Sequence, residues 1–483
     1  MNNTTSQDTS IERLLSLHSD RSVVLVQGLG YVGAVMSLVV ANAISGQYAV
    51  IAVDRDDESG RKKVGLFNGG HFPLVANDPK IEEYFTNARE RGNLCATVDR
   101  AAYELADVII VDINLDVNKQ INSDNNMAGY DIDLAPFASA IETIGAHCKP
   151  DVLILIETTV PPGTCRMVVE PIIQRKLSER GLPGEAVKIG HSYERVMPGP
   201  EYVDSIQNFY RVYSGVDEAS ADAVEGFLKT IVRTDEYPLT RLGETTATEI
   251  AKVLENSYRA MNIAFVTEWT SLAEESGVNL FEIVQAIRMR PTHANLMYPG
   301  IGVGGYCLTK DPLMASWSRK KMIGGQEGLD QSERAVTIND QMPKYAFEFL
   351  QRRHHQSLEG QTVLLLGASY RGDVGDTRFS PVESFYRYLA SAGTTIRVHD
   401  PFVAEWPEIG LRPESSFTAA TTPPPDIVVI SAGHSIYREE STISLLCAMT
   451  PLWIYDTVGL LAAPDIARLG EQHSVIVLGR GDL

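Results

Sequence analysis

One stretch near the start of the chain limits the possible folds more than any other. Residues 22–27, SVVLVQ, form an apolar run rich in β-branched residues, and the glycines of GLGYVG, Gly28, Gly30 and Gly33, follow directly. In a dinucleotide-binding fold the first glycine makes the turn after a strand, the second lets a pyrophosphate approach the backbone, and the third lets the helix pack on the strand. The stretch therefore predicts a strand, a tight turn and a helix whose N-terminus faces phosphate.

The next strand-like run supports this interpretation. Residues 48–53, YAVIAV, end at Asp54, which lies 26 residues after Gly28. At this spacing a carboxylate accepts hydrogen bonds from a ribose 2′-hydroxyl, so Asp54 favours NAD over NADP. An ordinary glycine turn with an exposed aspartate is the alternative. We rank it well below the cofactor site because strand, glycines and acid occur in the required order.

Apolar runs alternate with helical stretches through the first part of the chain. Residues 108–112, 152–156 and 187–190 have the pattern of further strands. Strands that alternate with helices predict a parallel, doubly wound sheet, and ligands of such sheets bind beyond the carboxyl ends of the strands. The polar residues that follow these strands, and that we expect near a ligand, are Asn114, Thr158, Thr159, Glu194 and Arg195.

The middle of the chain has the pattern of long helices. Residues 247–277 contain few helix breakers and keep a continuous apolar periodicity, which predicts one long helix ended by Gly277. Lys252 and Asn256 are four residues apart and therefore share one face of this helix. A lysine and an asparagine on a helix are otherwise usual surface residues. A second helix is expected at residues 280–289.

A second α/β domain is expected towards the C-terminus. Residues 361–366 have a strand pattern ahead of a turn at Gly367, and later strand-like runs occupy residues 395–398, 427–430, 453–455 and 475–478. Because this turn lacks the GxGxxG form, a mononucleotide is a better candidate ligand than a second dinucleotide. The predicted fold class is α/β, with two Rossmann-like, doubly wound parallel-sheet domains joined by a central helical domain with a long connecting helix.

A glycine-rich stretch, YPGIGVGGYCLTKDP at residues 298–312, contains a candidate nucleophile, Cys307. Its four glycines let the backbone turn tightly and approach a ligand, and Lys310 and Asp311 place charge within a turn of the sulfur. The thiolate is the reactive form, and a nearby cation lowers the thiol pKa from about 8.5. A buried structural cysteine is the alternative. The glycines and the charges favour the reactive thiol.

The composition disfavours several classes of function. The chain has 483 residues, enough for two or three domains, and a formal net charge of −20, which opposes binding to nucleic acid or an anionic membrane. Five scattered cysteines form no CxxC pair, which argues against structural zinc and favours a reducing compartment. The polar start is unlike a signal peptide, and no apolar run approaches the ~18 residues of a membrane helix. We therefore expect a cytoplasmic protein without a metal site.

Taken together, these motifs closely resemble the UDP-glucose/GDP-mannose dehydrogenase family over nearly the whole chain after residue 20. The motifs that carry the resemblance are GLGYVG, TVPPGT, SYERVMPG, AKVLEN, RAMNIAFVTE, GVGGYCLTKDP and GDTRFSP. The resemblance implies a polar tail at residues 1–20, an NAD-binding domain at 21–218, a helical, homodimer-forming domain at 219–340 and a UDP-sugar-binding domain at 341–483. It also implies oxidation of a sugar C6 alcohol to a carboxylate with two NAD⁺ in turn, which makes a precursor of surface polysaccharide or glycoconjugate.

The resemblance gives Cys307 and its helical partners a role. After a first oxidation of the alcohol, Cys307 would add to the aldehyde, and a second oxidation would turn the thiohemiacetal into a thioester that water hydrolyses. Lys252 and Asn256 would stabilise the oxyanion from one helix face.

Other site residues are implied by the same resemblance. Asp311 or Glu194 would position or deprotonate the water, and Thr159 would orient it. The residues expected to bind the cofactor are Gly28, Gly30, Tyr31, Val32, Gly33, Asp54, Thr159, Lys310 and Arg378. Those expected to bind the substrate are Glu194, Arg195, Lys252, Asn256, Arg290, Tyr298, Gly304 and Arg378.

The motifs favour one class of sugar without excluding another. ERVMPG and YPGxGVGG resemble members that act on UDP-N-acetylhexosamines, which we favour, whereas LTKDP with Lys310 resembles the UDP-glucose type. GDP-mannose is a minor alternative. Tyr306 and Tyr193 stand where His and Pro are common, and residues 112–114, DIN, replace a common Pro-Thr-Pro on the nicotinamide side.

Two other classes of function compete with this interpretation. A two-electron hydroxyacid dehydrogenase would need neither Cys307 nor residues 361–483. A non-catalytic binder of sugar nucleotides would be expected to have lost a catalytic position, whereas Lys252, Asn256 and Asp311 are all present. Both alternatives therefore rank below the four-electron dehydrogenase.

Overall fold

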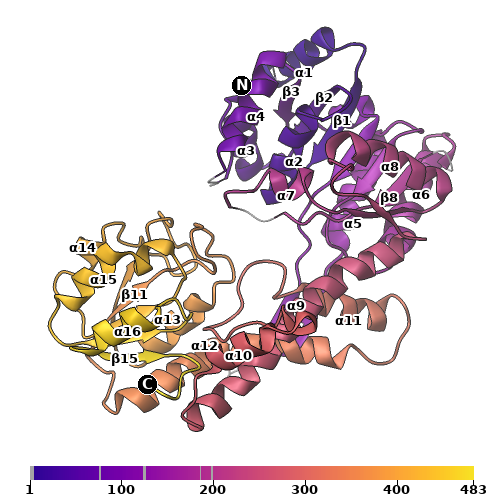
Figure 1. Cartoon of the computed structure of the whole chain (residues 1–483). Coiled ribbons are helices and arrows are strands. Elements are labelled where there is room, and N and C mark those ends of the chain that lie inside the picture. The colour runs from indigo at the N-terminus through magenta and orange to yellow at the C-terminus, as the bar shows by residue number, and fades with distance from the viewer. Residues whose placement is uncertain (1–4, 75–77, 123–126, 185–186, 197–198) are drawn as a thin grey trace. The chain divides into compact units, whose positions relative to one another are not determined.

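Two compact units make up the chain (Figure 1). The computed structural model describes residues 5–74, 78–122, 127–184, 187–196 and 199–483. The first unit consists of residues 1–118, 131–253 and 317–327, and the second of residues 119–130, 254–316 and 328–483. Met197 and Pro198 of the ERVMPG motif lie outside the described residues.

The first unit is built on a sheet with the strand order β10-β9-β8-β7-β4-β1-β2-β3. Its strands are β1 (Ser22–Gln27), β2 (Tyr48–Val53), β3 (Leu94–Thr97), β4 (Val108–Val111), β7 (Leu153–Ile156), β8 (Lys188–His191), β9 (Val212–Gly215) and β10 (Thr240–Arg241). Neighbouring strands run parallel except β8 and β9. The chain order reverses between β1 and β4, and such a switch point is where open α/β sheets bind ligands.

Helices cover this sheet, and polar side chains set several of their ends. The helices are α1 (Thr5–Leu17), α2 (Tyr31–Ala41), α3 (Glu58–Asn68), α4 (Pro79–Arg91), α5 (Ala135–His147), α6 (Glu170–Glu179), α7 (Asp204–Gln207) and α8 (Glu218–Ile231). The carboxylates of Asp57, Asp78 and Asp217 accept backbone N–H groups at the starts of α3, α4 and α8. Helix α2 is buried from Gly33 to Ala41, which places it in the core beside β1.

The second unit contains a five-stranded parallel sheet with the order β12-β11-β13-β14-β15. Its strands are β11 (Thr362–Leu366), β12 (Thr395–His399), β13 (Ile427–Ile430), β14 (Trp453–Asp456) and β15 (Ser474–Val477). Helices α13 (Pro381–Ser391), α14 (Phe417–Ala420), α15 (Glu440–Cys447) and α16 (Ala463–Gly470) accompany it, and β5 (Asn118–Ile121) pairs with β6 (Met127–Asp131). The α/β class and both parallel sheets predicted from the sequence are confirmed.

Long helices form the middle of the chain. Helix α9 (Thr245–Glu275) has 31 residues, and Gly277 beyond its end has φ +69°, in the left-handed region that suits glycine. It is followed by α10 (Leu280–Arg288), α11 (Asp311–Lys321) and α12 (Asp330–His354). The predicted helices at 247–277 and 280–289 are confirmed. The domain boundaries at 218/219 and 340/341 remain predictions, and the second falls within α12.

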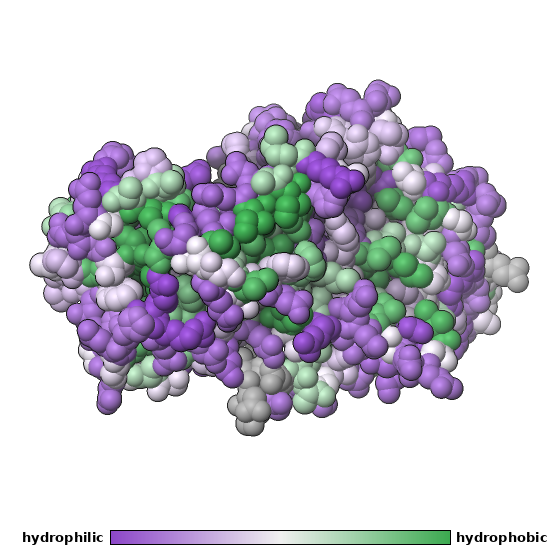
Figure 2. All heavy atoms as spheres, turned by 60° about the horizontal axis from the view of Figure 1, so that its bottom comes forward, coloured by the Kyte–Doolittle hydropathy of each residue, from purple (hydrophilic) through white to green (hydrophobic). Residues whose placement is uncertain are grey.

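One face of α9 exposes large apolar side chains. Leu254, Tyr258, Phe265, Trp269 and Leu272 are between 48% and 62% exposed. Their spacings of 4, 7, 4 and 3 residues place them on one side of the helix. Figure 2 shows apolar side chains, in green, gathered among polar ones on the face of the molecule that it presents. We call Leu254, Tyr258, Phe265, Trp269 and Leu272 the α9 stripe.

Candidate active site

A cleft of about 670 Å³ opens at the carboxyl ends of β1, β2 and β4 in the first unit, and the glycine turn forms part of its lining. Gly28 has φ +105°, and a Cβ there would lie 2.3 Å from the Asp112 carbonyl oxygen. At Gly33 a Cβ would lie 1.9 Å from the Gly28 oxygen. At Gly30, which lines the cleft, a Cβ would meet nothing within 4 Å. Gly28 and Gly33 are thus required for packing, and Gly30 keeps space open for a ligand.

The start of α2 suits a phosphate. Gly30 is its N-cap, and no side chain caps the helix, whose first residues are Tyr31 and Val32. An N-terminus without a side-chain cap directs its N–H groups and the positive end of the helix dipole towards an anion. The open position at Gly30 and this helix start together fit a pyrophosphate.

Asp54 stands at the end of β2 on the rim of the same cleft. Its Oδ2 accepts hydrogen bonds from the Leu29 N–H at 3.2 Å and from Lys63 Nζ at 3.0 Å, and its Oδ1 accepts from the Arg55 N–H at 2.7 Å. These contacts hold a carboxylate at the β2 end, the place from which it can accept a ribose hydroxyl. The cleft therefore fits NAD, as Asp54 predicts.

A group of buried charged residues lies beyond the ends of β4, β7 and β8. Asp112, Glu157 and Glu194 supply three carboxyl groups, and the wholly buried Arg211 donates to Glu157. Burial, aided by the charges of Glu157 and Glu194, raises the pKa of Asp112 well above its ordinary value. Burial raises the pKa of Glu157 to about 7, although Arg211 opposes the shift. We call these four residues the acid cluster.

The sequence pointed to only part of this cluster. Glu194 is a predicted site residue, and Asp112 stood out only as a departure from the family pattern. Glu157 and Arg211 were missed. The available signal was a charged residue placed directly after or before a short apolar strand, where it must enter the protein interior.

Lys252 and Glu194, both predicted site residues, lie together in the first unit. Lys252 Nζ donates to the Glu194 backbone oxygen at 2.9 Å and lies 3.9 Å from Glu194 Oε1. It also lies 5.4 Å from the centre of the Tyr193 ring, and Arg195 stacks on that ring and on Phe209. Both Lys252 and Glu194 are buried, so their charges act at low dielectric.

Thr159 follows β7 just before the Pro161–Gly163 turn. That turn is held by Glu249, a residue that was not predicted from the sequence. Glu249 on α9 is buried, and its carboxylate accepts the Gly163 N–H at 2.5 Å and the Cys165 N–H at 2.8 Å. Burial raises the pKa of Glu249 to about 7 against these two hydrogen bonds. Its position three residues before Lys252 was the available signal, because residues three apart share a helix face.

The cysteine loop belongs to the second unit. Cys307 is exposed, and its backbone oxygen accepts the Asp311 N–H at 2.9 Å at the start of α11. Asp311 is fully buried: its Oδ1 accepts from Lys310 Nζ at 2.9 Å and its Oδ2 from Asn256 Nδ2 at 2.6 Å. Lys310 also lies 4.4 Å from the centre of the Tyr306 ring. The buried Lys310 and Asp311, which follow Cys307 closely in sequence, thus form one polar group with the partly buried Asn256 of α9.

The glycines of this loop have a packing role. A Cβ on Gly304 would lie 2.3 Å from Tyr370 Cβ, and one on Gly302 would lie 2.5 Å from Pro381 Cβ. Gly305 has φ +80° and also faces Tyr370. These glycines let the loop approach residues 370–381, whereas a role in admitting a ligand was expected of them.

The remaining predicted residues are dispersed. Tyr298 stacks on Phe281 with ring centres 5.9 Å apart, and Arg290 is exposed at the start of a short helical turn at residues 291–293. Arg378 pairs with Asp376 through two hydrogen bonds of 2.9 and 2.7 Å. Lys310 and Arg378 belong to the second unit, and their expected contact with the cofactor remains a prediction.

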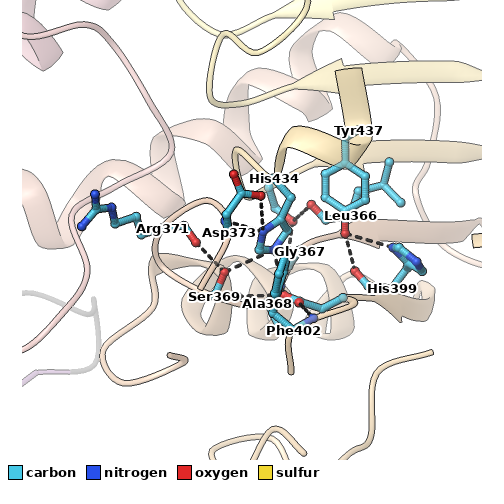
Figure 3. A network of polar contacts seen from close by, with 12 residues as sticks. Leu366, Gly367, Ala368, Ser369, Arg371, Asp373, His399, Phe402, His434 and Tyr437 are labelled. Atoms are coloured by element: carbon cyan, nitrogen blue, oxygen red, sulfur yellow. Dashed lines mark hydrogen bonds and ion pairs between the residues drawn. The ribbon is translucent and has the colours of Figure 1, made fainter. Parts of the chain in front are cut away.

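The second α/β sheet carries a turn of the same kind as the first, within a dense polar network (Figure 3). After β11, Gly367 turns with φ +106°, and Asp400 at the end of β12 accepts the Ala368 N–H at 2.8 Å. His434 Nε2 lies 3.1 Å from Asp400 Oδ2, and His434 Nδ1 accepts the Asp373 N–H at 2.8 Å. Figure 3 shows the His434 ring enclosed by this loop, with the Arg371 side chain pointing away from it.

Two further findings on the described residues concern membrane-spanning helices and metal sites. None of the described helices is long and apolar enough to cross a membrane. Within the same ranges, no group of three or more His, Cys, Asp or Glu side chains is arranged to hold a metal ion.

Models of three domains of one family match the chain in order. They are the NAD binding domain at residues 22–232, the central domain at 246–341 and the UDP binding domain at 364–463 of the UDP-glucose/GDP-mannose dehydrogenase family. The chain belongs to this family. It is therefore an oxidoreductase that acts on a nucleotide sugar with NAD as cofactor, and the cleft described above has the residues that NAD requires.

Individual members of the family resemble the chain over most of its length. A UDP-N-acetyl-D-mannosamine dehydrogenase of Methanocaldococcus jannaschii is 30% identical over 95% of this chain and 96% of its own. The structure of a UDP-D-ManNAc dehydrogenase from Pyrococcus horikoshii matches with a TM-score of 0.77 and 26% identity over 95% of this chain and all of that one. An NDP-N-acetyl-D-galactosaminuronic acid dehydrogenase from Methanosarcina mazei matches with a TM-score of 0.76 and 25% identity over 98% of both chains.

Proposed function

We propose that this protein oxidises the C6 hydroxyl of a UDP-N-acetylhexosamine to the uronic acid in two successive oxidations. The observation that carries the proposal is the exposed Cys307 on the same loop as the buried Lys310 and Asp311, because only the four-electron reaction needs a covalent thiol. The product would serve as a precursor of surface polysaccharide or glycoconjugate.

The role of the Cys307 thiol follows from the bonds that form and break in each step. Bound NAD⁺ supplies the hydride acceptor for each oxidation. Cys307 Sγ adds to the aldehyde carbon and its proton passes to the oxygen, which gives a thiohemiacetal. Loss of hydride and of that proton leaves a thioester, and water attacks its carbonyl to release the carboxylate and the thiol. In total, alcohol, water and two NAD⁺ give carboxylate, two NADH and three protons.

Charged and polar side chains have separate roles in this scheme. Lys252 and Asn256 lie one turn apart on α9 and stabilise the oxyanion as a cation and a neutral donor. Both carboxylate oxygens of Asp311 are occupied by Lys310 and Asn256, so we assign Asp311 to positioning Asn256. Glu194 is then the better candidate to accept a proton from water.

Thr159 completes the proposed water site. It begins the turn that Glu249 holds through the Gly163 and Cys165 N–H groups, so its backbone is fixed by a buried contact. We propose that its hydroxyl orients the hydrolytic water.

The choice of sugar rests on the relatives. Two of the similar proteins are named for UDP-N-acetylmannosamine and one for an N-acetylgalactosaminuronic acid nucleotide. Lys310 in LTKDP resembles the UDP-glucose type instead, so UDP-glucose is the second candidate and GDP-mannose a third.

The decisive experiment measures NADH formed with UDP-glucose, UDP-GlcNAc, UDP-GalNAc, UDP-ManNAc and GDP-mannose. We expect turnover of an N-acetylated UDP-sugar with two NADH per sugar oxidised. Cys307→Ser should abolish formation of the acid, with Cys447→Ser as the control at a partly exposed thiol. A steady ratio of one NADH per sugar would argue for a simple alcohol dehydrogenase.

We also propose that two copies of the chain associate through the α9 stripe. Five large side chains at about half exposure on one helix face make an apolar strip that a second, identical helix would cover. Trp269→Asp should convert a dimer to a monomer in light scattering, whereas Glu255→Ala on the same helix should not. A wild-type monomer at micromolar concentration would disprove this assembly.

A further inference from the structure

Apart from Glu194, the residues of the acid cluster have no role in the proposed reaction. Asp112 lines the cofactor cleft directly after β4, while Asp54 lines it after β2. In a sheet of this order the dinucleotide crosses the switch point between β1 and β4. With the adenosine ribose at the β2 end, the nicotinamide half lies on the side of β4 and Asp112.

The charges around Asp112 do not balance if every carboxyl is ionised. Asp112, Glu157 and Glu194 would contribute three negative charges, and Arg211 with Lys252, which lies 3.9 Å from Glu194, contributes two positive ones. His191 adds no charge, because burial lowers its pKa to about 3. One shared proton on the carboxyls makes this buried group neutral, and burial strongly favours the neutral state.

The hydrogen bonding agrees with a cluster in which one carboxyl group is protonated, because a buried carboxylate oxygen without a donor is costly. Asp112 is 9% exposed, and its Oδ2 has no hydrogen-bond partner among the described residues. Glu157 Oε2 is also buried without a hydrogen-bond partner among the described residues, while Glu157 Oε1 accepts a hydrogen bond from Arg211. The first turn of α2, packed on the other side of Asp112, contains neither an acidic nor a basic residue. The charge of the cluster therefore depends on its own members, on Lys252 and on any ligand in the cleft.

We propose that the acid cluster holds one shared proton, that the positively charged nicotinamide ring of NAD⁺ expels this proton on binding, and that the neutral ring of NADH leaves it in place. The direction is set by electrostatics, because a positive charge near a carboxyl group favours its ionised form. Linkage is reciprocal, so NAD⁺ must bind more tightly as the pH rises, whereas NADH must not. Reduction of the ring also restores the affinity of the cluster for one proton, and each alcohol oxidation releases one proton with its hydride.

The inference rests on the NAD cofactor of the family and not on the identity of the sugar. It is tested by calorimetric titration of the whole protein with NAD⁺ and with NADH, without sugar, in buffers of different ionisation enthalpy. We expect NAD⁺ binding to release up to one proton and NADH binding to release close to none. The dissociation constant of NAD⁺ should fall by up to about tenfold per pH unit across the titration of the cluster.

Asp112→Asn tests the assignment, because it keeps the shape of the side chain and removes the titrating group. The variant should bind both cofactors with little pH dependence and release no proton with NAD⁺. Asp116→Asn is the matched control, since Asp116 lines the same cleft but is exposed to solvent; its proton release should equal that of the wild type. Equal proton release with NAD⁺ and NADH, or release that persists in Asp112→Asn, would overturn the proposal. The first comparison needs only the wild-type protein, so it stands even if the variant fails to fold.

Discussion

The two parallel sheets contain nearly the same glycine turn with opposite surroundings. Gly28 and Gly367 have φ +105° and +106°, and their N–H groups donate to the last residues of β2 and β12 at 2.7 and 2.8 Å. Asp54 lines an open cleft, whereas the Asp400 carboxylate is wholly buried against His434. The backbone of the turn therefore does not by itself create a dinucleotide site. What differs is the space beyond the aspartate, which is open at Asp54 and filled by His434 at Asp400.

The segments after the two turns differ in the same sense. In the first unit α2 begins at Tyr31, three residues after Gly28, so its N-terminus meets the ligand. In the second unit the next helix, α13, begins only at Pro381, and residues 368–380 form a loop. The first arrangement fits a pyrophosphate at a helix N-terminus. In the second, a loop and not a helix N-terminus follows the glycine turn of the UDP binding domain.

The largest expected effect is at the open glycine of the first turn. Gly30→Val should raise the dissociation constant of NAD⁺ at least about 100-fold, or about 2.7 kcal/mol, because the side chain would enter the cleft. The fold should persist, since Gly30 has φ −87° and a Cβ there meets nothing within 4 Å. Calorimetry and circular dichroism measure the two quantities. Unchanged NAD⁺ binding would show that the cleft is not the cofactor site.

The two aspartates should differ in the same assay. Asp54→Ala removes an acceptor for the ribose hydroxyl and should weaken NAD⁺ binding roughly tenfold to 100-fold, the worth of a hydrogen bond to a charged group. Asp400→Ala is the matched variant in the second unit and should leave the NAD⁺ dissociation constant unchanged. If Asp400→Ala weakened NAD⁺ binding as much, the contrast between an open and a filled site would be wrong.

The contact between His434 and Asp400 in the second unit should contribute to folding stability and not to NAD⁺ binding. His434→Leu leaves the Asp400 carboxylate and the Asp373 N–H without the ring that joins them, which should cost about 2 kcal/mol of unfolding free energy. Urea unfolding followed by tryptophan fluorescence measures this loss, and NAD⁺ binding to the folded variant should be normal. His434→Gln, which can donate and accept, should recover part of the stability.

The smallest effect is a difference in pH dependence. Burial raises the pKa of Asp400, but His434 and the Ala368 and Phe402 N–H groups outweigh it, so the pKa lies below its ordinary value of 3.8. Its stabilising contribution is therefore present at neutral pH and lost only in acid. Glu249 has the opposite sign: with a pKa of about 7 against 4.5, the folded state binds more protons between these values. The stability of the wild type should fall as the pH rises through that window, by up to about 1.4 kcal/mol per pH unit.

Glu249→Gln tests this sign. Its unfolding free energy, measured in urea between pH 5 and pH 8, should vary less with pH than that of the wild type. Glu255→Gln, an exposed residue on the same helix, serves as the control and should keep the wild-type slope. An equal slope in wild type and Glu249→Gln would show that Glu249 does not titrate in this range.

The sequence predicted those parts of the molecule that depend on local pattern. The strands at 22–27 and 48–53, the long helix ended by Gly277 and the Asp54 cleft are all indicated by glycines, apolar runs and an acid at fixed spacing. The antiparallel strand β9 and the β5 and β6 pair were missed, because their short and partly polar sequences carry no distinct period. Pairing between strands, not local propensity, defines them.

The buried polar contacts could not be predicted from the sequence. Asp311 is, in the sequence, a charged residue near a cysteine, but its contact with Asn256 depends on the start of α11 lying against α9. Asp112, Glu157 and Arg211 are far apart in sequence, and only the order of the strands joins them. His434 gives no local sign that it fills the second turn.

Helix α9 also sets a rule for how this chain can vary between relatives. Lys252 and Asn256 share one face only because four residues advance slightly more than one full turn, and one inserted residue would rotate Asn256 by about 100° around the helix axis. Substitutions at the intervening positions alter side chains, whereas a change of length by one residue alters the direction of every later side chain on the helix. The codons between those of Lys252 and Asn256 should therefore accept conservative point mutations but neither insertions nor deletions of single codons.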